Sequence, residues 1–258
     1  RWGACSMRID LVTLFPQMCE AVLAESIVGR GRKRGAVQVV PHQLRDYAYD
    51  KHATVDDTVF GGGKGMLLLA EPIAACFDDL AETLGRKPYT LFMSPQGRPI
   101  DQKLLKALCA HENLCVLCGH YEGVDQRVLD AYVDEEVSLG DFVLTGGELP
   151  AVCLIDALAR LQPGVLSADE CFEEESHFGG LLEYPQYSRP QVWRGCPVPD
   201  MLMTGHHAKI AQWRHEQSLL NTLKKRPDLL KTAPLSEKDR AFLLENGAGE
   251  SLFSVETV

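Results

Sequence analysis

The sequence lacks any long apolar run. No hydrophobic stretch approaches the ~20 residues that a membrane-spanning helix needs, and the opening residues RWGACS lack the apolar core of a secretory signal. These absences indicate a cytoplasmic protein that does not enter a membrane. We expect the natural chain to begin at Met7, so that residues 1–6 are a remnant added ahead of it.

Metal-binding motifs are also missing. The nine cysteines are scattered and odd in number, and the chain has neither an HExxH motif nor a second CxxC to complete a zinc site. Cys115 and Cys118 lie in the apolar run NLCVLC, which is typical of a strand. Residues three apart on a strand face opposite sides. We therefore predict buried, reduced thiols and no metal site.

The common phosphate-binding and nucleophile motifs are absent as well. There is no GxxxxGK[ST], no GxGxxG after a strand and no GxSxG, and GGGKGM at residues 61–66 has the wrong spacing for a P-loop. A ligand of this protein is therefore not expected to be held chiefly by its phosphates.

Positive charge is scarce overall, because the formal net charge is −10. That balance argues against nonspecific binding of nucleic acid. Two local basic clusters remain, at residues 30–34 and 224–231. Either could contact phosphates, and either could be a solvated helix end.

What the sequence does contain is an alternation of short apolar runs with helical patterns through residues 7–161. This alternation predicts an α/β domain, a mostly parallel sheet with helices on both faces. We expect one helix over residues 17–29 ended by Gly29, and helix caps at Asp101 and Asp125. The predicted strands are residues 7–15, 36–40, 89–93, 113–118 and 133–139.

The alternation stops after Leu161. Residues 162–199 show no sustained period and are rich in Gly, Pro, Ser and acidic side chains, which predicts a mobile linker. Residues 200–258 are helical in pattern and predict a small all-α C-terminal domain.

Three of the predicted strands run into loops that contain glycine and polar residues. YTLFM is followed by SPQGRP, NLCVLC by GHYEGVD, and VDEEVSL by GDFVLTGGELP. Ligands of open α/β sheets bind at the carboxyl ends of the strands. Glycine allows the backbone to approach a ligand closely. Together the three loops predict a ligand pocket built largely from main-chain groups.

Six segments in order carry a specific resemblance: LVTLFPQM, TVDDTVFGGGKGM, LFMSPQGRPIDQ, CGHYEGVDQRV, LGDFVLTGGELP and GLLEYPQYSRP. Together they resemble the bacterial tRNA (guanine-N1)-methyltransferase family, TrmD, of the SPOUT class, over nearly the whole chain. The resemblance implies a trefoil knot, which sequence patterns alone would not propose because knots are nearly absent from proteins. It also implies a homodimer with active sites at the subunit interface, and a C-terminal domain that binds tRNA.

The activity that the resemblance implies is S-adenosylmethionine-dependent methylation of N1 of guanosine 37 in tRNAs with guanosine at position 36. Magnesium is a possible further requirement, although no ligand cluster is evident in the sequence. By position in the shared motifs, the cofactor pocket would comprise Ser94, Pro95, Gln96, Gly119, Tyr121, Glu122, Gly123, Leu139, Gly140, Asp141, Phe142, Val143, Leu144, Gly146, Gly147 and Pro150.

Catalytic residues follow from the same resemblance. Guanine N1 carries a proton at neutral pH, so methylation calls for a general base, and the charge that develops on O6 calls for a donor. Arg160 matches the family's catalytic arginine. Glu175 matches the position of its catalytic aspartate, with Glu174 as the rival assignment. The departure from aspartate adds one methylene.

Two further positions, Asp56 and Ser176, match residues expected near the guanosines, although either could instead be a cap or turn residue. His206 replaces the asparagine of the family's GNHA motif, which puts that local contact in doubt. Two other functions stay open: a knotted methyltransferase acting on ribosomal RNA, and a non-catalytic RNA-binding module.

Overall fold

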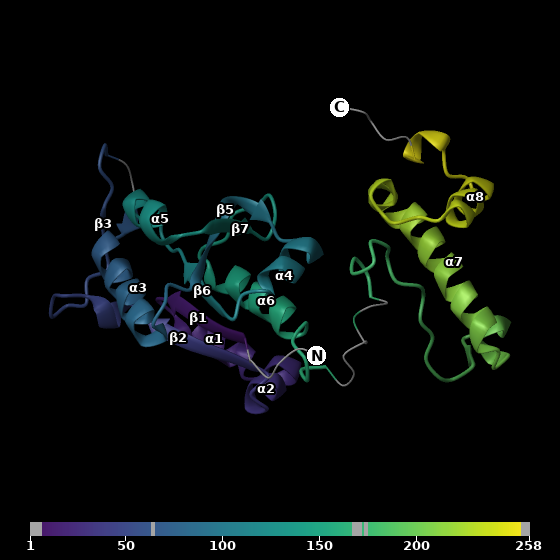
Figure 1. Cartoon of the computed structure of the whole chain (residues 1–258), viewed down its shortest axis with the longest axis horizontal. Helices are drawn as coiled ribbons and strands as arrows, with labels where there is room; N and C mark the ends of the chain where they lie inside the picture. Colours follow the sequence, from purple (N-terminus) through teal and green to yellow (C-terminus); the bar gives the residue numbers. More distant parts are fainter. Residues whose placement is uncertain (1–6, 63–64, 167–171, 173–174, 254–258) are drawn as a thin grey trace. The chain divides into compact units, whose positions relative to one another are not determined.

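The computed structural model describes residues 7–62, 65–166, 172 and 175–253. The chain divides into two compact units, Arg1–Asp169 and Glu170–Val258, which are described separately (Figure 1). The expectation that residues 1–6 are an added remnant concerns residues outside the described part.

In its described part, the first unit is built on a five-stranded sheet in the order β2-β1-β6-β5-β7. Each neighbouring pair is parallel, which confirms the predicted parallel sheet. A parallel neighbour requires a crossover connection, and helices supply it. The strands are β1 (Met7–Thr13), β2 (Val37–Gln43), β5 (Tyr89–Pro99), β6 (Asn113–Cys118) and β7 (Glu135–Ser138).

Alternate residues of the strands enter separate cores on the two faces of the sheet. Ile9 and Leu11 of β1 belong to one buried cluster, while Val12 belongs to the other. Helices α1, α2, α4 and α6 contribute to the first cluster, and α3 and α5 to the second, so helices cover both faces as predicted. Their bounds are α1 Pro16–Leu23, α2 Ser26–Lys33, α3 Ala70–Leu84, α4 Gln102–Leu108, α5 Gln126–Tyr132 and α6 Glu148–Ala159.

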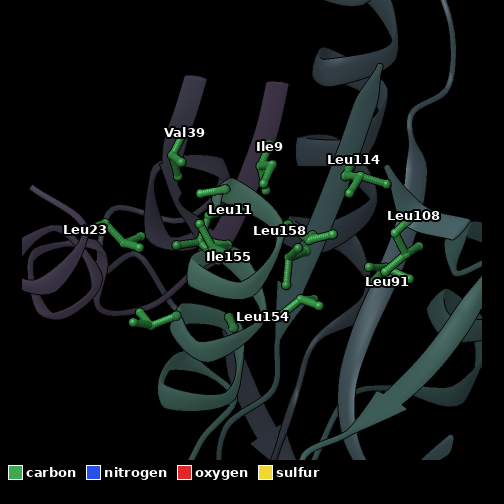
Figure 2. Packing of buried hydrophobic residues seen from close by; sticks show 14 of the residues in the cluster. Ile9, Leu11, Leu23, Val39, Leu91, Leu108, Leu114, Leu154, Ile155 and Leu158 are labelled. Carbon is green, nitrogen blue, oxygen red and sulfur yellow. The ribbon is translucent and has the colours of Figure 1, made fainter. Parts of the chain in front are cut away.

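Helix α6 carries the most continuous apolar surface against the sheet. Leu154, Ile155 and Leu158 are all but inaccessible to solvent, and Figure 2 shows them packed beside Ile9 and Leu11 of β1. Leucine and isoleucine burial of this kind contributes about 1.5–3 kcal/mol per side chain. This packing fixes where α6 begins, and its first turn lies next to the site described below.

The two cysteines of the CxxC sequence lie on opposite faces of β6, as predicted. Cys115 belongs to one core cluster and Cys118 to the other. Burial raises the pKa of each thiol well above its ordinary value. Both are therefore inert core residues.

The prediction of one helix over residues 17–29 is wrong. The chain forms α1 and α2, separated at Ala24 and Glu25, and Gly29 lies inside α2 without ending it. A β-carbon on Gly29 would lie 2.0 Å from the carbonyl oxygen of Ala24. The glycine is needed because the two helices approach closely at the break. The caps at Asp101 and Asp125 are confirmed, since each side chain accepts a hydrogen bond from its own helix.

A short antiparallel hairpin, which the sequence patterns did not predict, lies beside the sheet. It pairs β3 (Asp56–Thr58) with β4 (Met66–Leu68). Its second strand holds the loop after β6, because Leu68 N–H donates to Gly123 O and Glu122 N–H donates to Met66 O, both at 3.0 Å.

The second unit is mainly helical, as predicted. Leu219, Leu230 and Leu243 form its buried centre. Part of the segment predicted as a linker is attached to it: Leu182 N–H donates to Thr222 Oγ1 at 2.9 Å, and Asn221 Nδ2 donates to Glu183 O at 2.7 Å. The described elements are β8 (Val192–Trp193), β9 (Cys196–Pro197), η2 (Asp200–Met203), α7 (His207–Lys225), η3 (Pro227–Lys231), α8 (Glu237–Glu245) and η4 (Glu250–Phe253), with η1 (Leu44–Tyr47) in the first unit.

Among the described residues, no helix is long and apolar enough to cross a membrane. The trefoil knot stays an expectation from the resemblance, and so does the mobility of residues 162–199.

A buried carboxylate on β1 is paired with a histidine on the neighbouring edge strand β2. Asp10 is fully inaccessible, and it accepts hydrogen bonds from the Arg8 guanidinium at 2.8 and 2.9 Å. His42 Nε2 lies 2.8 Å from its Oδ1. Burial alone would raise the pKa of Asp10, but the hydrogen bonds from His42 and Arg8 outweigh it and lower the pKa below its ordinary value. The native fold therefore favours the ionised form.

Replacing Asp10 by Asn is expected to lower the free energy of unfolding by about 3 kcal/mol, because Arg8 and His42 lose a buried charged partner. A carboxylate with a lowered native pKa stabilises the fold above its unfolded pKa of about 4. That contribution is lost as the pH falls through the native value.

Urea unfolding between pH 7 and pH 2.5 measures this directly. The difference between wild type and Asp10→Asn should be constant above about pH 4 and should shrink below it. The exposed Glu245→Gln is the control, with an expected change within about 0.5 kcal/mol. A pH-independent difference for Asp10→Asn would contradict the assignment.

Candidate functional site

A cavity of about 230 Å³ lies beside the middle of β5 and at the carboxyl ends of β6 and β7, where the three glycine-containing segments meet. Main-chain segments and apolar side chains line it. Its lining consists of Phe92, Met93, Ser94, Pro95, Gly119, His120, Tyr121, Glu122, Gly123, Val137, Ser138, Leu139, Phe142, Val143, Leu144, Thr145, Gly146, Gly147 and Pro150.

The first wall is SPQG, which continues strand β5 and is not a separate loop. Strand pairing with β7 is interrupted after Met93 and resumes at Arg98. Ser94 is buried at the interruption, and its hydroxyl accepts a hydrogen bond from Gln96 N–H at 3.2 Å. Gly97 crosses β7 so closely that a β-carbon would lie 2.4 Å from Val137 N.

The second wall is GHYEG, residues 119–123, directly after β6. Tyr121 has a positive φ of 58°, which turns the chain sharply there. The Glu122 side chain packs on Gly65, where a β-carbon would lie 2.4 Å from Glu122 Cγ. Gly65 therefore leaves room for the Glu122 side chain, a role that a comparison with phosphate-binding loops could not indicate.

The third wall is the loop between β7 and α6. Its entry is fixed by Ser138, whose hydroxyl hydrogen-bonds both N–H and C=O of Gly140. Its exit is fixed by Gly147, whose N–H donates to Gly119 O at 2.8 Å. A β-carbon on Gly147 would lie 2.8 Å from Cys118 Cα, so only glycine allows this approach. Between them, Phe142, Val143 and Leu144 are exposed.

The structure brings together nearly all of the predicted cofactor residues. Gln96, Gly140 and Asp141 fall outside the lining of the cavity. Six lining residues were missed by the motif comparison: Phe92, Met93, His120, Val137, Ser138 and Thr145. The apolar ones are strand ends, and their burial was predictable even though their place in the cavity was not.

Beneath the cavity lies a second group of polar side chains. Glu148, in the first turn of α6, is only 2% exposed. It accepts a hydrogen bond from Thr13 Oγ1 at 2.8 Å. His120 Nδ1 lies 3.6 Å from its other oxygen, Oε2. A buried carboxylate thus connects the end of β1 to two walls of the cavity.

The predicted catalytic residues lie in different units. Arg160 is the half-buried residue that ends α6 in the first unit. Glu175 lies in the second unit, in a cavity of about 370 Å³ that Tyr184 and Arg214 also line. The Arg214 guanidinium lies 4.9 Å from the centre of the Tyr184 ring. The rival base, Glu174, lies outside the described residues.

The predicted substrate residues are also divided between the units. Asp56 begins β3 and is half-buried, apart from the lining of the cofactor cavity. The Ser176 hydroxyl accepts a hydrogen bond from Glu183 N–H at 3.0 Å. Within the described ranges, no group of three or more His, Cys, Asp or Glu residues is placed to hold a metal ion.

The family model for tRNA (Guanine-1)-methyltransferase TrmD matches residues 7–232 of the chain. The chain belongs to this family. TrmD relatives match it over nearly their whole lengths, so both units of the chain are part of the likeness. The family assignment therefore agrees with the resemblance noted in the sequence.

Two curated TrmD relatives illustrate the similarity. The tRNA (guanine-N(1)-)-methyltransferase of Ruminiclostridium cellulolyticum is 50% identical over 228 residues, covering 88% of this chain and 98% of that protein. The enzyme of the same name from Alkaliphilus oremlandii is 49% identical over 242 residues, covering 92% and 97%. Among solved structures, the tRNA (m1G37) methyltransferase from Aquifex aeolicus matches with a TM-score of 0.71 and 40% identity. It covers 90% of this chain and 99% of that one.

The family implies a methyl donor, and the cavity offers a main-chain surface on which a ligand could bind. Gly119, Gly146 and Gly147 have no room for β-carbons, so main-chain donors and acceptors stand at the surface of the cavity. Phe142, Leu144 and Pro150 add apolar surface to the cavity.

Proposed function

We propose that this protein transfers a methyl group from S-adenosylmethionine to N1 of guanosine 37 in tRNAs that carry guanosine at position 36. The reaction would take place in the cytoplasm. The observation that supports the proposal is the cavity beside β5 and at the ends of β6 and β7, because three of the segments that resemble the TrmD family line it.

The cofactor would be held mainly by the three loops. Gly119, Leu139 and Gly146 offer main-chain groups to its adenine and ribose, and Leu144 and Pro150 offer apolar contacts. Glu122 offers a carboxylate on the same wall, which suits a ligand with positively charged amino and sulfonium groups. When bound, S-adenosylmethionine supplies an activated methyl group, so positioning contributes much of the catalysis.

The protein's own chemistry concerns the guanine. Glu175 accepts the N1 proton, and the electron pair on N1 forms the new bond to the methyl carbon while the carbon–sulfur pair leaves with sulfur. Negative charge grows on O6 as the proton leaves, and Arg160 donates hydrogen bonds to it. Asp56 and Ser176 contact the neighbouring guanosines. The expectation of magnesium rests on the resemblance alone.

Binding of tRNA is assigned to the C-terminal unit together with its basic cluster at residues 224–231. Two ion pairs reduce the positive charge that the basic clusters can offer to phosphates. Arg226 pairs with Asp228 at 2.6 Å, and Arg32 pairs with Glu20 at 3.0 Å. Lys224 and Lys225 are both exposed at the end of α7 and remain suited to phosphate contacts.

A homodimer is proposed from an exposed apolar face on the first unit. Helices α1 and α6 pack side by side. Phe15, Met18 and Val22 on the first and Leu149 on the second are 42–53% exposed. We call these four residues the α1–α6 face. Monomers rarely leave a contiguous apolar face uncovered. A second subunit would cover it and bring its own Glu175 to the neighbouring cavity.

The first prediction of the proposed function concerns the reaction itself. Purified protein with S-adenosylmethionine is expected to methylate N1 of guanosine 37 in a transcript with guanosines at positions 36 and 37, read by primer extension and mass spectrometry. The same transcript with adenosine at position 36 is the matched control and should react far more slowly. Methylation of ribosomal RNA fragments alone would favour the other knotted methyltransferase, and no methylation at all would favour a non-catalytic module.

The second prediction concerns the base. Glu175→Gln should lower kcat by at least about 100-fold, because an amide cannot take the N1 proton. Its affinity for S-adenosylmethionine should be unchanged, because Glu175 lies in the unit that does not contain the cofactor cavity. Glu174→Gln is the matched control and should retain activity. The reverse pattern would move the assignment to Glu174.

The third prediction concerns the dimer. Val22→Arg places a charge in the α1–α6 face and should convert dimers to monomers in sedimentation velocity, with loss of methyl transfer. Leu244→Arg, at a comparably exposed leucine of α8, should leave the dimer intact. If Val22→Arg sediments like the wild type, the α1–α6 face is not the dimer interface.

A further inference from the structure

Glu148 is a buried acid with an unusual position, directly under the cofactor cavity. It stands in the first turn of the twelve-residue helix α6, where the helix dipole favours negative charge. The adjoining residues Gly146, Gly147 and Pro150 line the cavity, but Glu148 itself does not. Its carboxylate must therefore act through other residues.

One of its oxygens is anchored to the sheet. The Thr13 hydroxyl donates to Glu148 Oε1 at 2.8 Å and is itself fully buried. The same hydroxyl accepts from Phe15 N–H at 2.9 Å. The hydroxyl thus uses its single proton on Glu148 while it accepts from the main chain of Phe15. This contact connects α6 to the carboxyl end of β1.

The other oxygen faces the loop after β6. Oε2 lies 3.6 Å from His120 Nδ1, close enough for an ion pair but too long for a hydrogen bond. His120 Nδ1 is buried and, within the described residues, has no hydrogen-bond partner. A buried nitrogen without a partner costs free energy, which a small closing movement would recover.

Both atoms lie beneath Gly146, at the wall of the cavity. A β-carbon there would lie 2.4 Å from Glu148 Oε2 and 2.5 Å from His120 Nδ1. His120 and Gly146 also form an isolated antiparallel bridge. Closure of the gap between Oε2 and Nδ1 would therefore draw two walls of the cavity together.

We propose that Glu148, held by Thr13, is a positioning residue that sets the approach of the His120 loop and the Gly146 loop. Binding of S-adenosylmethionine completes the hydrogen bond between Glu148 and His120. This inference rests on the proposed function, and it assigns to Glu148 an effect on cofactor affinity with no contact to the cofactor.

The test measures S-adenosylmethionine affinity by calorimetry, and kcat and KM with matched tRNA, for two pairs of variants. Glu148→Leu removes both contacts. Glu148→Gln keeps an acceptor for Thr13, and its amide N–H can donate to His120 Nδ1 when the ring carries its proton on Nε2. Thr13→Val removes the hydroxyl, and Thr13→Ser keeps it.

The leucine and valine variants should lose about tenfold in affinity, as expected for one hydrogen bond to a charged group. Their KM for the cofactor should rise while kcat at saturating cofactor stays near the wild-type value. The glutamine and serine variants should restore binding.

Asp10→Asn is the control for lost stability, because Asp10 lies mid-strand in β1 and outside the cavity lining. It should lower the melting temperature without changing cofactor affinity. If Glu148→Leu and Thr13→Val bind the cofactor like the wild type, the inference is overturned while the proposed function stands. A wild-type chain that does not bind S-adenosylmethionine overturns both.

Discussion

The close approach of two main-chain segments holds the candidate site together. Gly147 N–H donates to Gly119 O at 2.8 Å, and neither the N-terminus of α6 nor the end of β6 has space for another side chain there. Two of the three walls of the cavity meet at this contact, because it joins the loop after β6 to the loop before α6. Glycine is required here for want of space, since Gly147 itself has an ordinary helical φ.

The same region combines a main-chain surface with a buried acid below it. The apolar side of α6 fixes the helix against the sheet through residues such as Ile155 and Leu158. That packing places Glu148 where Thr13 can bind it. Packing, a hydrogen bond and the loop geometry are therefore coupled, and a change in one of them reaches the cavity surface.

The proposed reaction divides its parts between the two units. The methyl donor's cavity and Arg160 belong to the first unit, and Glu175 belongs to the second. Under the proposed function, the two units contribute different parts of one reaction. The exposed Phe142, Val143 and Leu144 fit this view, because apolar side chains on a cavity rim are suited to being covered by another surface.

Much of the fold could be predicted from the residues. Strand and helix periods gave the five parallel strands, the opposite facing of Cys115 and Cys118, and the helical C-terminal unit, because these follow from local patterns of burial. The break between α1 and α2 could not be predicted, since its cause at Gly29 is a contact with Ala24 that has no local signature. The β3–β4 hairpin could not be predicted either, because its strands are too short to show a period.

The sequence by itself determined the family, the positions of the three loops and most of the residues that line the cavity, because these are carried by contiguous motifs. Only the tertiary structure decided that Gln96 and Asp141 stay outside the cavity and that His120 enters it. Only the tertiary structure joined Thr13 to Glu148, which are separated by 135 positions. The physical reason is that motifs record which residues lie on one loop, whereas contacts between loops depend on how the sheet and its helices pack.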